Sequence, residues 1–352
     1  PELRARLSVW YHAHARELPR RSDPTPYRVW MSEIMLQQTR VDTVIPYFER
    51  FQEAFPTVER LAAATEDEVL GLWSGLGYYR RARALHGAAR VVVELGEFPT
   101  TLEGLLQLPG VGRYTAGAIA SIAFGIPAPV LDGNVARVLS RLLAFEQPVD
   151  KPAGQRILWS VAEALVDVRD PSAHNQAMME LGALVCTPKS PRCGECPVRE
   201  DCRAVEQGGM ARYPIKAPRR KPKKVREVAG MLMDPHRGVL LAKRPDEGLL
   251  AGLWEMPAGE WPDRVEASVA LQSVWRERMG VAVEVGERLG EVEHVFTHRK
   301  LRLVIHQVQV HSGDPSALGY PELRWVDQES VGGLPLSRLT KKVLAAVGWH
   351  DV

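Results

Sequence analysis

A turn with two glycines, followed by an aspartate, combines the groups needed to bind a phosphate and to act on a bound substrate. Gly110 and Gly112 lie two residues apart in the segment 108–115, a spacing that predicts a tight turn with outward-pointing amides. The small residues that follow predict a closely packed helix, whose N-terminus carries free amides and a partial positive charge. Such a turn can bind a phosphate group. Asp132 lies one short loop beyond that helix. Alternatively, Asp132 only caps the next helix, predicted at 134–144, and the two interpretations are compatible.

The four cysteines of the chain lie in one short segment, with the spacing Cys-x6-Cys-x2-Cys-x5-Cys. They are Cys186, Cys193, Cys196 and Cys202. Disulfides in so short a loop would leave the rest of the chain without any, so this clustering indicates a metal site in a reducing compartment. Zinc sites usually contain two Cys-x2-Cys pairs, and this segment has one. The uneven spacing suits a [4Fe-4S] cluster better, with zinc as the alternative.

Length and charge limit the architecture. The 352 residues allow two or three domains, each with its own core. The net charge of +2 is close to neutral, so attraction to nucleic acid must come from local patches. Residues 1–10 lack the apolar segment of a signal peptide. The longest uncharged run, 114–131, contains two prolines, and we therefore expect a buried helix ending near Phe124 in a soluble protein.

Apolar residues recur at helical spacing through the first two hundred residues. Thr65 is a suitable N-cap for a helix at 66–73. Further helices are predicted at 3–11, 29–39, 41–51, 81–95, 102–108, 115–124, 134–144, 155–168 and 175–185. Residues 1–209 are thus predicted to form a mainly helical domain that contains the turn 108–115 and the cysteine segment 186–202.

The composition changes after residue 209. Residues 212–226 contain eight Lys or Arg, three Pro and no acidic residue. We predict an extended linker at 210–226, which serves as a tether or contacts phosphate. Strands are then predicted at 228–233, 239–242 and 301–308, with one helix at 265–279. Residues 227–352 are therefore expected to form an α+β domain.

The glycine turn, Asp132 and the cysteine segment together resemble the helix-hairpin-helix family of DNA base-excision glycosylases. Members similar to endonuclease III carry a lysine two residues after the second hairpin glycine, and its amine cleaves the DNA strand. This chain has Tyr114 there, which lacks the amine, so lyase chemistry is not expected. The run 31–39, Met-Ser-Glu-Ile-Met-Leu-Gln-Gln-Thr, and the strand-rich second domain narrow the resemblance to adenine DNA glycosylases of the MutY type.

This resemblance implies a monofunctional enzyme that hydrolyses the N-glycosidic bond of adenine paired with 8-oxoguanine or guanine in duplex DNA. Its expected cofactor is a [4Fe-4S] cluster. We expect a monomer that binds DNA and no membrane, located in the bacterial cytoplasm at the nucleoid. Three alternatives stay open: a glycosylase for another mispaired base such as thymine, a nucleotide pyrophosphatase with a helical DNA tether, and a non-catalytic DNA sensor.

The resemblance also suggests catalytic roles. Glu33 is the single acid in the apolar run 29–36, and we expect burial to keep a proton on it for a ring nitrogen of adenine. Asp132 should stay ionised and face the positive charge that develops on the sugar, as an electrostatic partner or transient nucleophile. Tyr114 and Asn134 are expected to hydrogen-bond Asp132 or the sugar. The alternatives are a surface position for Glu33 and packing or capping roles for Tyr114 and Asn134.

Several residues match positions that contact DNA in the family. Gln38 and Tyr78 correspond to the intercalating side chains that fill the gap left by a flipped base. The family usually has Leu-Pro-Trp-Arg early in the chain, and here residues 18–21 read Leu-Pro-Arg-Arg. Leu18 and Arg21 persist, and Arg20 replaces the tryptophan in the wall of the adenine pocket. A core position for Tyr78 is the alternative.

The second domain resembles a Nudix hydrolase fold, whose members degrade oxidised nucleotides. With Gly259 as its first glycine, the catalytic box fits without gaps. Its Mg²⁺-binding acids are missing, because Val265, Val274 and Arg278 replace glutamates and Glu277 alone remains. One carboxylate cannot form the oxygen cage that Mg²⁺ requires, so the domain is expected to recognise and not to cut.

The expected recognition element is a turn that reads Phe-Ser-His in the family and contacts the oxidised guanine. In this chain it reads Phe296-Thr297-His298. Threonine keeps the hydroxyl donor and adds a methyl group, so the contact with 8-oxoguanine is still expected. An ordinary strand turn is the alternative.

Overall fold

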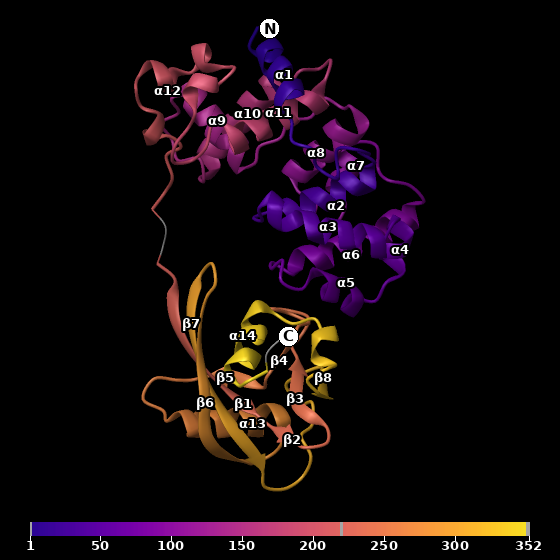
Figure 1. The fold of residues 1–352 in the computed structure, drawn as a ribbon, viewed down its shortest axis with the longest axis vertical. Coiled ribbons are helices and arrows are strands. Elements are labelled where there is room, and N and C mark those ends of the chain that lie inside the picture. Colours follow the sequence, from indigo (N-terminus) through magenta and orange to yellow (C-terminus); the bar gives the residue numbers. More distant parts are fainter. Residues whose placement is uncertain (1, 219–220, 350–352) are drawn as a thin grey trace. The chain divides into compact units, whose positions relative to one another are not determined.

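A computed structural model of the chain describes residues 2–218 and 221–349. Arg219 and Arg220, in the predicted linker, lie outside the described residues. The chain divides into two compact units, Pro1–Ala63 with Ala84–Arg219 and Ala64–Arg83 with Arg220–Val352. The first unit is built of helices, and the second contains the strands (Figure 1).

The helical unit follows the predicted pattern closely. Its helices are α1 (Glu2–His14), α2 (Pro26–Leu36), α3 (Val41–Ala54), α4 (Val58–Ala63), α6 (Arg80–Leu95, which begins in the other unit), α7 (Leu102–Leu106), α8 (Arg113–Phe124), α9 (Gly133–Leu143), α10 (Pro152–Leu165), α11 (Pro171–Leu184) and α12 (Arg203–Glu206). Single 3-10 turns η1 (Cys193–Glu195), η2 (Arg199–Asp201) and η3 (Met210–Arg212) accompany them. The buried helix predicted to end near Phe124 is confirmed as α8, which stops at Gly125 in the left-handed conformation.

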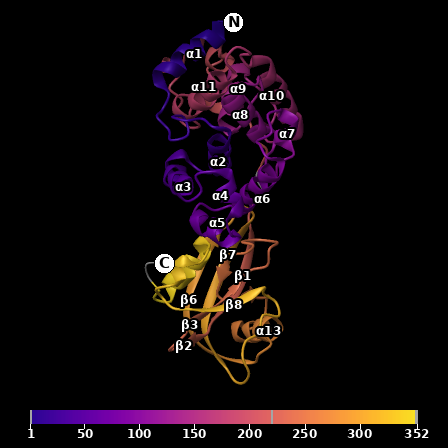
Figure 2. The same ribbon diagram turned by 90° about the vertical axis from the view of Figure 1, so that its right-hand side faces the viewer.

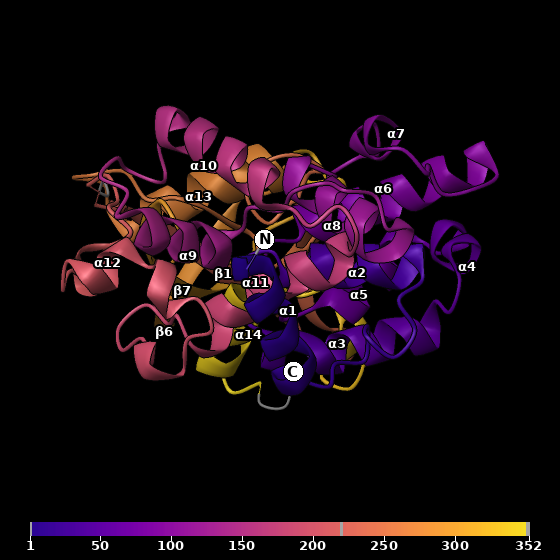
Figure 3. The ribbon, with the colours of Figure 1, turned by 90° about the horizontal axis from the view of Figure 1, so that it is seen from above.

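Small residues bring the central helices close together. α8 packs against α2 and α11, and α11 also packs against α9 (Figure 2, Figure 3). A Cβ atom on Gly117 would lie 2.2 Å from the carbonyl oxygen of Pro129, and one on Gly182 would lie 2.6 Å from the Cβ of Asn134. Because a larger residue would force these backbones apart, the glycines fix the position of the α9 N-terminus.

The second unit contains two sheets and short helices. β5, β1, β7 and β6 form one sheet, in which β1 and β7 are parallel. In the other, β3 pairs with β2, β4 and β8. The bounds are β1 (Lys223–Met231), β2 (Met233–Asp234), β3 (Gly238–Lys243), β4 (Trp254–Glu255), β5 (Ala258–Glu260), β6 (Val283–Val295), β7 (Arg299–Val310), β8 (Glu322–Val326), α5 (Glu66–Trp73), α13 (Ala267–Met279), η4 (Val331–Gly333) and α14 (Arg338–Ala346). The predicted α+β class is confirmed.

Alternation along the strands produces two cores. In β1, Val228 contributes to a core with α13, whereas its neighbour Ala229 contributes to a core with β3, β7 and α14. β6 was not predicted from the sequence, because most of its side chains are exposed or half-buried. Antiparallel pairing with β7 holds β6 in its strand conformation instead. β1 begins at Lys223, inside the predicted linker, since it pairs with β7 from that residue onward.

Within the described ranges, the structure contains no helix with the length and apolar character that a bilayer crossing requires.

Candidate active site

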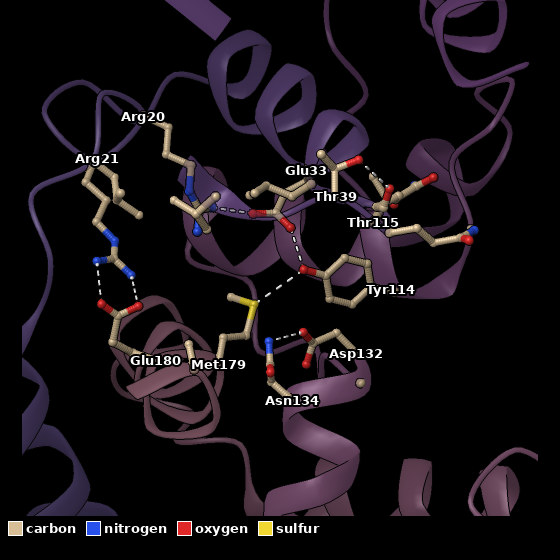
Figure 4. A pocket seen from close by; sticks show the side chains of 18 of the residues that line it. Arg20, Arg21, Glu33, Thr39, Tyr114, Thr115, Asp132, Asn134, Met179 and Glu180 are labelled. Carbon is tan, nitrogen blue, oxygen red and sulfur yellow. Dashed lines mark hydrogen bonds and ion pairs between the residues drawn. The ribbon is translucent and has the colours of Figure 1, made fainter. Parts of the chain in front are cut away.

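A cavity of about 620 Å³ in the helical unit brings the predicted residues together (Figure 4). Its walls come from segments far apart in the sequence: the loop before α2, the end of α2, the glycine turn, and the starts of α8 and α9. The predicted residues in its lining are Leu18, Arg21, Glu33, Gln38, Gly110, Gly112, Tyr114, Asp132 and Asn134. Arg20, expected in the wall of the adenine pocket, also lines it, and Met179 and Glu180 line it without having been predicted.

Glu33 is fully buried, as expected, and both of its carboxyl oxygens have a partner. Its Oε1 atom is paired with Nη1 of Arg20, and its Oε2 atom accepts a hydrogen bond of 2.5 Å from the hydroxyl of Tyr114. Both oxygens therefore act as acceptors in the empty cavity. Each partner is a hydrogen-bond donor, and the role of Glu33 as the acid stays a prediction.

Tyr114 is held in its protonated form. Burial and the negative charges of Glu33 and Asp132 raise the pKa of its hydroxyl well above the usual value of 10. The hydroxyl therefore donates to Glu33, and it also contacts Sδ of Met179 at 3.4 Å. The position of Tyr114 on the first turn of α8 brings its hydroxyl to Glu33, and its expected contact with the sugar stays a prediction.

Asp132 caps helix α9 and remains part of the cavity wall. Its Oδ1 atom accepts a bond of 2.7 Å from the Val135 amide, and its Oδ2 atom accepts one of 2.9 Å from Nδ2 of Asn134. The predicted bond between Asn134 and Asp132 is thus present, and the capping interpretation is confirmed. Burial raises the pKa of Asp132, the Val135 amide opposes this, and the charge of Glu33 adds to the rise.

Leu18 and Arg21 both line the cavity, and they differ in the contacts that they make. Leu18 is 9% exposed and contributes an apolar wall. Arg21 donates to Glu180 at 3.1 Å and to Gln176 at 3.0 Å. Burial raises the pKa of Glu180, but bonds from Arg16 and Arg21 outweigh it and lower that pKa to about 2. In the structure, Arg21 therefore anchors the loop before α2 to α11.

The glycine turn has the geometry expected of a phosphate-binding hairpin. Gly110 adopts a left-handed conformation with φ +74°, and Gly112 precedes α8 in an extended conformation. No side chain among the described residues caps the N-terminus of α8. Its first amides are therefore not used by a side-chain cap.

Gly110→Ala is expected to lower the free energy of unfolding by more than the ~1–2 kcal/mol that a left-handed backbone costs a residue with a side chain. The added Cβ atom would also lie 2.5 Å from the Cβ of Ala84. Gly112→Ala is the matched control, because a Cβ there meets no atom within 4 Å. Urea denaturation measures the free energy of unfolding of each variant, and duplex-binding titrations measure its affinity for DNA. Equal stability of the two variants would contradict the prediction.

The two candidate intercalating residues share an unusual backbone. Gln38 has φ +59° and Tyr78 has φ +51°, values that residues other than glycine seldom adopt. Both side chains are exposed, Tyr78 to 48%, so the core alternative for Tyr78 is wrong. Strained backbones at exposed positions are typical of functional contacts. Gln38 lies in the helical unit and Tyr78 in the segment 64–83 of the other unit.

The predicted recognition turn lies between β6 and β7. Phe296 is half-buried and its ring meets that of His294 at a tilt of 57°, with the ring centroids 4.6 Å apart, whereas Thr297 and His298 are exposed. In the segment that resembles a Nudix catalytic box, Arg278 donates to the carbonyl oxygen of Ala258 and to the hydroxyl of Tyr320. A guanidinium group thus binds the backbone beside Gly259, where a glutamate would be needed to hold Mg²⁺.

The four cysteines are free, partly exposed thiols in one loop around η1 and η2. Burial, and to a lesser extent the three other cysteines, raise the pKa of Cys196 to about 11, so a cation is needed to hold the sulfurs as thiolates together. Among the described residues, no three His, Cys, Asp or Glu side chains are close enough to hold one metal ion. Four cysteine thiols in one loop are the donor set that a four-iron cluster takes.

Two buried arginines link this loop to the cavity. Arg141 donates to Sγ of Cys186 at 3.3 Å and to two carbonyl oxygens of the loop. Arg137 donates to the carbonyl oxygen of Cys186 at 2.7 Å and to Oδ1 of Asn134 at 2.9 Å. Since Asn134 bonds Asp132, a continuous set of hydrogen bonds runs from Cys186 to the candidate catalytic carboxylate.

Comparison with known families agrees with these features. Residues 31–163 match the HhH-GPD superfamily of base excision DNA repair proteins, residues 186–202 match the iron-sulfur binding domain of endonuclease III, and residues 228–346 match the NUDIX domain. The cofactor is therefore a [4Fe-4S] cluster.

The chain is similar along almost its whole length to curated proteins. It is 39% identical to the adenine DNA glycosylase of Homo sapiens, over 97% of this chain and 73% of that protein. It is 39% identical to the one from Arabidopsis thaliana, over 89% of this chain and 58% of that protein. Among solved structures, a thermostable thymine-DNA glycosylase matches 58% of this chain and 95% of its own, with 28% identity and a TM-score of 0.53. A trapped endonuclease III–DNA covalent intermediate matches the same shares, with 25% identity and a TM-score of 0.50.

Proposed function

The chain belongs to the adenine DNA glycosylase family of base-excision repair enzymes, and from this premise we propose that it removes adenine paired with 8-oxoguanine or guanine in duplex DNA. The observation that carries this proposal is the cavity itself. It combines the buried Glu33, the capping aspartate Asp132 and a tyrosine at the position that a lyase fills with lysine. Two carboxyl groups with different surroundings are what hydrolysis of a glycosidic bond requires.

In the proposed reaction, Glu33 gives a proton to a ring nitrogen of the flipped adenine. The bond between base and sugar then breaks, and its electron pair leaves with the base. Water adds to the resulting sugar cation and gives up a proton, which balances the proton that left Glu33. Asp132 faces the cation that develops on the sugar, and its orientation is held by the Val135 amide and Asn134. Arg20 and the hydroxyl of Tyr114 each hold one carboxyl oxygen of Glu33.

We propose that the enzyme is monofunctional. Among the described residues that line the cavity there is no lysine. The buried Tyr114 hydroxyl cannot form a Schiff base with the sugar, so strand cleavage has no amine nucleophile at this site.

The proposed ligands of the cluster are Cys186, Cys193, Cys196 and Cys202. When bound, the cluster cross-links the loop between α11 and α12 through its iron–sulfur bonds. The basic residues near these ligands, Lys189, Arg192 and Arg199, would then be presented to DNA phosphate.

We further propose a division of labour between residues 1–209 as glycosylase domain, 210–226 as linker and 227–352 as recognition domain. Gly110 and Gly112 would bind phosphate, Leu18, Arg21, Gln38 and Tyr78 would contact the opened duplex, and Phe296, Thr297 and His298 would contact 8-oxoguanine. The exposure of Thr297 and His298 supports this role. We also propose that the enzyme acts as a monomer in the bacterial cytoplasm, at the nucleoid.

Base release from duplexes that pair adenine with 8-oxoguanine, guanine, cytosine or thymine tests the proposal. We expect fastest release opposite 8-oxoguanine, with an intact strand until alkali is added. Thymine paired with guanine is the matched negative substrate, given the similarity to a thymine-DNA glycosylase. Faster release of thymine than of adenine would contradict the proposed specificity, and strand breaks without alkali would contradict monofunctional chemistry.

A further inference from the structure

Arg20 is the cavity residue whose presence the proposed reaction leaves unexplained. Its side chain is about nine-tenths buried, and Glu33, its ion-pair partner, is fully buried. Taking a guanidinium group out of water is costly unless its charge and donors are satisfied. Arg20 has five N–H donors, and Glu33 is its one hydrogen-bond partner among the described residues. Its buried Nε atom has no partner.

The other buried arginines of this unit are held differently. Arg21 bonds Glu180, Gln176 and a backbone carbonyl oxygen, and Arg137 bonds three carbonyl oxygens and Asn134. Such arginines are fixed from several directions. Arg20 is held by one carboxylate in the wall of the cavity, so it has fewer hydrogen bonds to lose than Arg21 or Arg137 when it moves.

The other charges around Glu33 do not replace this pairing. Tyr114 on α8 is a neutral donor, and Asp132 before α9 is a like charge. Arg16 and Arg21 face Glu180 on α11, and Arg113 lies 3.8 Å from Glu163. α3 contributes only Val41 to the cavity lining. Among the described residues, Arg20 is therefore the cation that pairs with Glu33.

We propose that Arg20 is a positioning residue that keeps Glu33 ionised and fixed while the cavity is empty, and releases it when a base enters. The inference rests on the proposed function, because it assumes that Glu33 is the acid. On base entry the ion pair separates, Glu33 takes a proton from solvent, and that proton passes to the ring nitrogen of the base. The guanidinium group then becomes free to donate to acceptor atoms of the purine, such as a ring nitrogen.

This exchange predicts a split between two pH profiles. The profile of kcat/KM reports the free enzyme, and that of kcat reports the complex. Replacing Arg20 by a neutral residue removes the positive charge from the free enzyme, so protonated Glu33 persists to higher pH. For Arg20→Gln we expect the alkaline limb of kcat/KM to move up by about 1–3 pH units, the usual effect of an opposite charge at contact distance. The alkaline limb of kcat should move by less than half as much.

Arg20→Lys is the conservative variant, because it keeps the positive charge. The alkaline limb of its kcat/KM profile should stay within a few tenths of a pH unit of that of the unmodified chain. Arg169→Gln, which removes an exposed arginine paired with Asp167, is the matched control and should shift neither profile. No shift for Arg20→Gln would overturn the proposal. An equal shift of the alkaline limb of kcat would contradict the proposed separation of Arg20 from Glu33, because the ion pair would then persist in the complex.

Infrared difference spectra provide a readout without turnover. Spectra of the unmodified chain minus Glu33→Gln isolate the Glu33 band, and we expect a carboxylate signal at neutral pH without DNA. In an Arg20→Gln background, the same difference should convert to a protonated carboxyl band at a pH about 1–3 units higher than in the unmodified chain. A protonated band in the unmodified chain at neutral pH would overturn the inference. If the unmodified chain released no base from any duplex, the proposed function would fail, and the spectra would still decide whether Arg20 controls Glu33.

Discussion

Glu33→Gln and Asp132→Asn are each expected to slow adenine release by about 10²- to 10⁴-fold, the range attributed to a positioned acid or base. Glutamine cannot donate the proton to the base, and asparagine carries no charge to stabilise the sugar cation. Affinity for the mispaired duplex should survive in both variants, since neither change removes a phosphate contact. Single-turnover assays with duplex in excess of its dissociation constant measure the chemical step apart from binding.

A matched control separates catalysis from helix capping. Asp132 caps α9 through the Val135 amide at 2.7 Å, and Asp170 caps α11 through the Ala173 amide at 2.9 Å. Asparagine is as good a cap as aspartate, so Asp170→Asn should leave the rate unchanged. Undiminished adenine release by Asp132→Asn would refute its catalytic role, and an equal loss in Asp170→Asn would assign the effect to capping.

The same carboxylate predicts the acid side of the pH profile. Burial raises the pKa of Asp132 above its usual value near 3.8. As the pH falls through that raised value, Asp132 takes up a proton and the electrostatic support for the sugar cation is lost. Adenine release by the unmodified chain should therefore decline on the acid side, and the residual rate of Asp132→Asn should lack this limb.

Arg137→Met is expected to lower both cluster content and adenine release, the latter by at least about tenfold, the equivalent of one lost hydrogen bond to a charged group. Arg137 is 8% exposed and joins the carbonyl oxygens of Cys186 and Gly182 to the amide of Asn134. Methionine fills similar space without any donor. Each buried acceptor left without a partner costs about 1–3 kcal/mol, so the melting temperature should also fall.

Iron analysis, thermal melting and single-turnover release measure these three effects. Arg137→Lys should restore part of each, because an ammonium group can reach some of the same acceptors but lacks the planar fork. Full iron content together with an undiminished rate in Arg137→Met would show that the hydrogen bonds from Cys186 to Asp132 support neither the loop nor the carboxylate. Lost iron with an undiminished rate would confine Arg137 to the cysteine loop.

Local chemistry made much of the fold predictable. Thr65 caps α5 in a reciprocal box with Glu68, as its position before an apolar run indicates. Gly125 ends α8 in the left-handed conformation that glycine adopts without strain. β6 escaped prediction because its order comes from a ladder with β7 and not from its own side chains. Local sequence rules therefore predicted these helices, whose own residues mark their ends, and missed β6, whose order comes from pairing with a neighbouring strand.

The candidate site shows the same limit. The sequence by itself determined that Glu33 would be buried, that Tyr114 would replace a lyase lysine, and that four cysteines would share one loop, because apolar patterning and spacing act locally. Only the tertiary structure decided which charge meets Glu33. Arg20 reaches it from a loop whose path is set by the anchoring of Arg21 to Glu180, a contact between residues 159 positions apart. Long-range ion pairs of this kind depend on how helices pack, and no local pattern encodes them.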